Sequence, residues 1–115
     1  MSKEINTIVA LCDFNIINTV CKDIAENKTN REVNELLVEE LSELIKTAIK
    51  LQRWDNGETT LRYNIDEIYN NLYEELGDVI IMLLQFIYKN RINYNDLIEK
   101  ISAKLIRYYE TISDK

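Results

Sequence analysis

Two acidic stretches decide the fold of this 115-residue chain: Glu39-Glu40-Leu41-Ser42-Glu43 and Glu74-Glu75-Leu76-Gly77-Asp78. Each stretch sets two carboxylates three residues apart, so on an α-helix the two share one face. Both stretches lie within apolar residues that recur every three to four positions, which predicts amphipathic helices. Carboxylates on a core-facing helix surface are costly, and the usual reason for them is a bound metal ion.

The first acidic stretch has one carboxylate at the centre of its apolar stripe. With about 100° of rotation per residue, Val33 and Leu51 fall about 20° from Glu40 on a helical wheel. Glu43 falls about 60° to one side of Glu40 by the same geometry. Glu39 lies about 100° from the stripe centre and is interpreted as solvent-facing.

The second acidic stretch repeats this arrangement. Ile68 and Phe86 fall about 20° from Glu75, and Asp78 lies about 60° to one side. Glu74, about 100° away, is again interpreted as solvent-facing. If the two helices pack face to face, four carboxylates converge on one site: Glu40, Glu43, Glu75 and Asp78.

Four adjacent carboxylates need protonation, basic partners or a cation to neutralise them. Carboxylate oxygens are hard ligands that suit Mg²⁺, with Mn²⁺ as a possible substitute. Magnesium commonly shares its coordination shell with substrate phosphates. The bland alternative is a solvated acidic face, which is weakest for Glu40 and Glu75 because both are central in their stripes.

Hydrophobic periodicity and capping signals predict four helices and no strand, in one domain over residues 1–115. The helices are expected at about Ser2–Ala25, from a Thr29 N-cap to about Asp55, from about Asn64–Asp66 to Asn90, and from Asn93 or Asn95 to about Ser113. The fold class is therefore all-α and four-helix bundle-like.

Two helices carry apolar surfaces that are expected to be buried. Residues 79–88 are apolar nearly all round, so this end of the third helix is expected to be buried from several sides, including by a second subunit. The last helix is expected to turn an apolar face inward, formed by Leu97, Ile101, Leu105, Tyr108 and Ile112. We expect a homodimer or a tetramer.

Composition excludes several classes of partner and site. A net charge of −6 argues against nucleic acid or an anionic membrane as the main partner. The chain has no histidine, which removes histidine bases and most zinc or di-iron sites. Cys12 and Cys21 are too far apart on one helix to form a disulfide. The start lacks a signal-peptide pattern and the longest apolar stretch is too short to cross a bilayer, so a cytoplasmic protein is expected.

The paired motifs resemble those of the MazG-like, all-α nucleoside triphosphate pyrophosphohydrolases. The likeness rests on Glu-x-x-Glu at Glu40 and Glu43, on Glu-x-x-Asp at Glu75 and Asp78, and on the residues that flank them. The last helix, with its Lys-x-x-Arg, is also similar, so the resemblance covers about residues 29–108. It implies Mg²⁺-dependent hydrolysis of a nucleoside triphosphate to the monophosphate and pyrophosphate. All four carboxylates are then metal ligands, and Glu40 or Glu43 is alternatively the general base for the attacking water.

Two residues lie on the same line of the second helix as Glu43. Lys50 and Trp54 both fall within about 20° of it. Lys50 is a candidate phosphate contact, and Trp54 is a candidate for stacking on a base. A solvated lysine and a core tryptophan are equally good interpretations.

Three further residues are candidate substrate contacts. Gln85 lies within about 20° of the Asp78 line, where it could meet the base or support a metal ligand, or only satisfy a buried backbone group. Lys104 and Arg107 match the basic pair of the family that this sequence resembles, which implies triphosphate binding. A surface charge pair is the alternative for these two.

Three functional hypotheses follow. The first is a pyrophosphohydrolase acting on deoxynucleotides or aberrant nucleotides, in keeping with the house-cleaning role that the resemblance implies. The second is a phosphoribosyl-ATP pyrophosphohydrolase of the same superfamily. The third is a non-catalytic helical module whose acidic stripe binds a basic helix or peptide.

Overall fold

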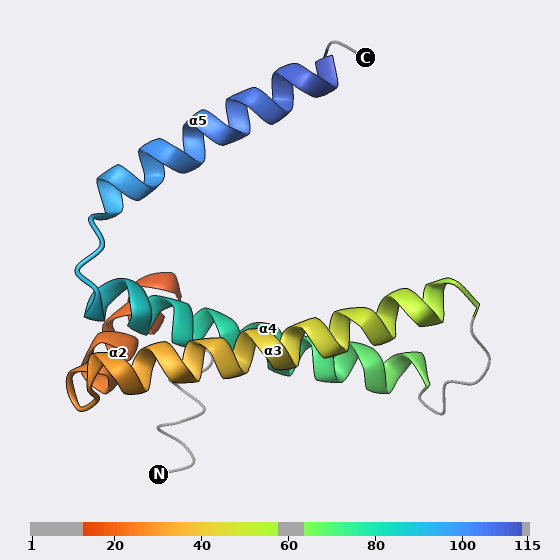
Figure 1. Ribbon diagram of the computed structural model, residues 1–115, viewed down its shortest axis with the longest axis horizontal. Coiled ribbons are helices and arrows are strands. Elements are labelled where there is room, and N and C mark those ends of the chain that lie inside the picture. The colour runs from red at the N-terminus through yellow and green to blue at the C-terminus, as the bar shows by residue number, and fades with distance from the viewer. Residues whose placement is uncertain (1–12, 58–63, 114–115) are drawn as a thin grey trace.

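The computed structural model describes residues 13–57 and 64–113, which form four α-helices and no strand (Figure 1). The helices are α2 (Phe14–Glu26), α3 (Asn30–Asp55), α4 (Ile65–Lys89) and α5 (Tyr94–Ser113). The all-α prediction is confirmed, and three helices lie within a residue or two of their expected bounds. The predicted helical segment 2–12, including Cys12, and the connection 58–63 lie outside the described residues.

Side-chain caps explain where the helices begin, including α5, where Asn93 Oδ1 accepts a hydrogen bond from the Asp96 amide at 3.1 Å. Thr29 Oγ1 accepts a hydrogen bond from the Glu32 amide at 3.1 Å, as the capping pattern predicts. Asn64 caps α4 in the same way, through the Glu67 amide at 2.8 Å. Asp13 caps α2, because its Oδ1 accepts a hydrogen bond from the Ile16 amide at 3.0 Å. At the other end of α3, Asn56 is followed by Gly57 with φ +73°, a conformation that glycine adopts without strain.

Helix α4 is the centre of the packed region. It runs antiparallel to α3 and also packs against α2 (Figure 1). The core between α3 and α4 is built on Val33, Leu37 and Met82, with Leu36 and Phe86 packed against it. Removing these side chains from water supplies the main driving force for pairing the two helices.

Two polar contacts tie α4 to the region where α2 leads into α3. Lys28 Nζ donates to Gln85 Oε1 at 3.1 Å, and the Tyr88 hydroxyl donates to Glu26 Oε1 at 2.7 Å. Gln85 is only 1% exposed, so its hydrogen bond with Lys28 satisfies a buried amide. These contacts fix the carboxyl-terminal end of α4 against the start of α3.

Helix α5 projects away from the other three helices (Figure 1). No residue of α5 is buried, and its apolar side chains from Ile98 to Ile112 are exposed. The expected inward face of the last helix is therefore wrong for a single chain. The turn before α5 explains the direction, because Arg91 takes a left-handed φ of 54° and the Tyr94 hydroxyl donates to Asn18 Oδ1 at 3.0 Å.

The apolar end of α4 is also less covered than expected. Val79, Met82 and Leu84 are buried, but Ile80 and Ile81 on the far side are exposed. Among the described residues, α3 and α2 cover two sides of this end of α4, and part of its surface stays exposed. Among the described helices, none is long and apolar enough to cross a membrane.

Candidate metal centre

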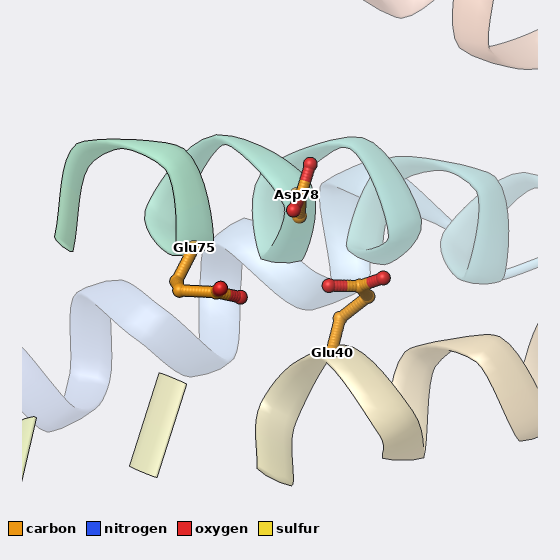
Figure 2. A group of neighbouring side chains, drawn as sticks. All are labelled: Glu40, Glu75 and Asp78. Carbon is orange, nitrogen blue, oxygen red and sulfur yellow. The ribbon is translucent and has the colours of Figure 1, made fainter. Parts of the chain in front are cut away.

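Three carboxylates meet where α3 crosses α4. Glu40 comes from α3, and Glu75 and Asp78 come from successive turns of α4 (Figure 2). One oxygen of each lies within 4.8 Å of the others. Glu40 and Glu75 are half-buried and Asp78 is exposed, so the cluster has one face in the helix interface and one toward solvent.

One oxygen of this cluster lacks a partner. Glu75 Oε2 is inaccessible to solvent and accepts no hydrogen bond from any described residue. A carboxylate oxygen removed from water without a partner costs free energy. A cation placed between the three carboxylates would satisfy this oxygen, and the donor set, all carboxylate oxygens, is the one that Mg²⁺ and Mn²⁺ prefer.

Burial and neighbouring negative charges raise the pKa values of two glutamates in the cluster, Glu40 and Glu75. Burial raises the pKa of Glu40, and the negative charges of Asp78 and Glu75 raise it further, followed by those of Glu39 and Glu43. Burial also raises the pKa of Glu75, with Asp78 as the next cause. Every charge that shifts these two pKa values is negative, so the site disfavours its own ionised form until a cation or protons neutralise it.

Glu43 lies beside this cluster but not in it. Its side chain is exposed and forms an ion pair with Lys46 Nζ at 3.5 Å, one turn further along α3. Exposed pairs of this kind are weak, so the carboxylate is not firmly held away from the site. The structure therefore brings together three of the four predicted ligands and leaves Glu43 at the edge.

The predicted substrate contacts on α3 and α4 do not converge. Lys50 is half-buried and lies seven residues beyond Glu43, about 10 Å along the helix axis, and Trp54 lies still further on. Gln85 lies about 10 Å beyond Asp78 along α4. Because α3 and α4 are antiparallel, Lys50 and Gln85 lie toward opposite ends of the helix pair (Figure 1).

The basic pair on α5 is remote from the carboxylates. Lys104 and Arg107 are exposed on a helix that projects away from α3 and α4 (Figure 1). Within one chain, neither side chain is placed to contact a ligand held at the acidic cluster.

The sequence analysis did not identify two lysines that contact candidate site residues: Lys46, which pairs with Glu43, and Lys28, which donates a hydrogen bond to Gln85. Lys46, three residues after Glu43, is visible in the sequence as a helical neighbour of opposite charge. Lys28, which engages Gln85, is 57 residues away in the sequence and gives no local signal.

The family comparison matches the part of the chain that carries the cluster. The model of the MazG nucleotide pyrophosphohydrolase domain matches residues 28–112, which include α3, α4 and almost all of α5. There is no significant match to a curated protein or to a solved structure.

Proposed function

The chain belongs to the MazG nucleotide pyrophosphohydrolase family, and on that premise we propose that it hydrolyses a nucleoside triphosphate to the monophosphate and pyrophosphate. The reaction needs a divalent cation, which we take to be Mg²⁺, with Mn²⁺ as a substitute. We infer that the substrate is a deoxynucleotide or an aberrant nucleotide and that the role is house-cleaning. The observation that carries the proposal is the cluster of Glu40, Glu75 and Asp78, with its unpartnered buried oxygen.

The three clustered carboxylates are the proposed metal ligands. These carboxylates would hold a magnesium ion, and the chemistry that it would supply is positive charge that polarises the phosphate oxygens of the substrate. Glu40 lies on α3 and Glu75 lies on α4, so the packing of these two helices sets the distance between the two ligands. Asp78, on the exposed side, faces the direction from which a triphosphate can approach.

We propose that Glu43 is the general base. Its alternative role is that of a fourth metal ligand. Its carboxylate lies beside the cluster and is held only by the exposed pair with Lys46. A water molecule that attacks the triphosphate gives its proton to this carboxylate as the new P–O bond forms. The bond between the α- and β-phosphates breaks, and pyrophosphate leaves with the electron pair of that bond.

The substrate contacts extend from this centre in different directions. We propose that Lys50 contacts phosphate and that Trp54, which is partly exposed, stacks on the base. Gln85 accepts a hydrogen bond from Lys28, and this contact holds α4 in place. A direct contact between Gln85 and the base would require this hydrogen bond to break. Lys104 and Arg107 are proposed triphosphate contacts. Because α5 projects away from the cluster of Glu40, Glu75 and Asp78, these contacts require either that α5 moves or that α5 of a second chain supplies them.

A pyrophosphate-release assay tests this function. The full chain is incubated with Mg²⁺ and a panel of canonical and modified nucleoside triphosphates, together with phosphoribosyl-ATP. We expect release from at least one nucleoside triphosphate, abolished in Glu40→Gln and Asp78→Asn and kept in Glu39→Gln. Release only from phosphoribosyl-ATP assigns the chain to that reaction instead. A folded chain that releases pyrophosphate from nothing and binds basic peptides more weakly as salt rises is a binding module, and the proposal is then wrong.

A further inference from the structure

A polar hollow lies at the end of the packed helices where α4 ends and α2 leads into α3 (Figure 1). It is lined by the last residue of α2, the first residue of α3 and the end of α4 with the turn that follows: Glu26, Asn30, Tyr88, Lys89 and Arg91. The hollow holds about 280 Å³, close to the roughly 300 Å³ at which small-molecule sites begin. Its size therefore suits a small ligand.

The hollow is well separated from the carboxylate cluster. Asn30 lies about 15 Å before Glu40 along α3, and Lys89 lies about 17 Å beyond Asp78 along α4. None of the residues that line the hollow belongs to the cluster. A ligand bound in the hollow therefore has contacts of its own, apart from the candidate metal centre.

Positive charge gathers at the hollow, although the whole chain carries a net charge of −6. Lys89 and Arg91 line it, and among the described residues neither forms an ion pair. Lys22 lies nearby, with its Nζ 5.9 Å from the centre of the Tyr88 ring. Cations without carboxylate partners around a hollow favour an anionic ligand.

Two carboxylates lie at the same end of the molecule, and only Glu26 lines the hollow. Its Oε1 accepts the hydrogen bond from the Tyr88 hydroxyl, which leaves the other oxygen without a partner among the described residues. This hydrogen bond and burial raise the pKa of Tyr88, and the negative charge of exposed Asp23 raises it further. Three cations thus outnumber two carboxylates, and the second oxygen of Glu26 can accept a hydrogen bond from a ligand.

The turn that carries Lys89 and Arg91 is fixed in place. Arg91 takes a left-handed φ of 54°, and its amide donates to the Tyr88 carbonyl at 3.1 Å. Across the helix pair, Asn30 Nδ2 donates to the Lys89 carbonyl at 3.4 Å. Because these contacts already hold the walls of the hollow, a ligand loses little binding free energy to ordering them.

We propose that the hollow binds a small phosphate monoester that also carries hydroxyl groups. The guanidinium of Arg91 and the ammonium of Lys89 contact the phosphate oxygens through charge-assisted hydrogen bonds. Glu26 accepts a hydrogen bond from a hydroxyl group of the same molecule. The proposal does not depend on the pyrophosphohydrolase function, because it uses none of the metal ligands.

An NMR titration of the full, isotope-labelled chain with ribose 5-phosphate tests this site. EDTA is present throughout, so that the carboxylate cluster holds no cation. We expect saturable shifts of the Asn30 and Arg91 amide signals and none at Asp78. Ribose without the phosphate should cause no shift. The absence of a saturable shift with ribose 5-phosphate, or equal binding of ribose, overturns the proposal.

Inorganic phosphate separates the two halves of the proposed ligand. It lacks the sugar hydroxyls, so it should shift the same amide signals but bind at least about 3-fold more weakly than ribose 5-phosphate. Inorganic phosphate that binds as tightly as the sugar phosphate contradicts the contact between Glu26 and a hydroxyl group.

Charge-matched variants test the two cations. Arg91→Asn keeps a residue type that tolerates a left-handed φ, and Lys89→Gln is an exchange on the surface of α4. Each should weaken binding of ribose 5-phosphate at least about 5-fold. The control is Arg31→Gln, which removes a positive charge next to Asn30 but outside the lining, where Arg31 pairs with Glu35 at 2.8 Å. It should change binding by less than about 2-fold, with circular dichroism confirming the helix content of all three variants. Equal losses in all three overturn the proposal.

Discussion

The two sides of α4 differ in what they leave unsatisfied. Toward α3, the helix presents Glu75 and Asp78 to Glu40, and one carboxylate oxygen has no partner among the described residues. Toward α2, the same helix presents Gly77, Ile80 and Ile81, which line an apolar groove. Among the described residues, the first side lacks positive charge and the second lacks full apolar cover. Neither arrangement benefits the isolated chain, so each indicates something that the chain binds.

The sharpest way to break the acidic side is to remove the charge of Glu75. We expect Glu75→Gln to lower pyrophosphate release by about 100-fold or more, since loss of a group that only supports a metal ligand already costs 10- to 100-fold. The matched control is Glu74→Gln, which removes a solvent-facing charge on the same turn and should change activity by less than about 3-fold. Similar losses in both variants would mean that the cluster has no special role.

Adding and removing a divalent cation tests the carboxylate cluster without an activity assay. Mg²⁺ or Mn²⁺ should stabilise the wild-type chain by about 2.7 kcal/mol at a hundred times the dissociation constant. For a chain of this length that corresponds to a rise in melting temperature of several degrees, reversed by EDTA. Differential scanning calorimetry of Glu40→Gln should show little or no rise. An equal rise in wild type and variant would place the bound cation elsewhere.

The pH dependence of stability gives a smaller effect with a defined sign. The pKa values of Glu40 and Glu75 are raised in the folded state, so the folded chain binds protons more tightly than the unfolded chain. Their contribution to stability is fully present below the ordinary glutamate pKa of about 4.3. It is lost as pH rises through the raised values of the folded state.

Urea unfolding in EDTA measures this contribution. Between about pH 4.5 and 7, the metal-free wild type should lose more stability than the Glu40→Gln, Glu75→Gln double variant. The difference between the two chains isolates the cluster from the other carboxylates. Saturating Mg²⁺ should reverse the trend, because protons and the cation compete for the same oxygens. Parallel curves for the two chains would show that the cluster is not strained by its own charge.

The smallest expected effect concerns Gly77 on the apolar side. A Cβ at this position would meet no atom within 4 Å in a single chain. Gly77→Ala should therefore stabilise the helix by about 0.5–1 kcal/mol in urea unfolding, because alanine has the higher helix propensity. A clear loss of stability would contradict the open space that the structure shows beside Gly77.

Much of the fold is predictable because its determinants are local. The Thr29 cap with its Glu32 amide is visible in the sequence, as are the stripes that pair α3 with α4. The direction of α5 is not predictable in this way. It depends on one left-handed residue, Arg91, and on a hydrogen bond between Tyr94 and Asn18, which are far apart in the sequence.

The candidate site also has a part that is predictable from local sequence and a part that is not. Helical-wheel geometry places Glu40 and Glu75 at the centres of their stripes, and antiparallel packing is enough to bring them together with Asp78. Angular position alone cannot show distance along the axis. For that reason Lys50 and Gln85, which lie on favourable lines, are separated toward opposite ends of the helix pair.

The central claim is that Glu40, Glu75 and Asp78 bind a divalent cation, and a Mn²⁺ titration followed by electron paramagnetic resonance tests it most directly. Free Mn²⁺ gives a signal that is lost on binding, so the titration needs neither substrate nor turnover. We expect saturable binding by the wild type and by Glu74→Gln, and binding at least about 10-fold weaker in Glu75→Gln. Equal binding by all three chains, or none by the folded wild type, would contradict the claim.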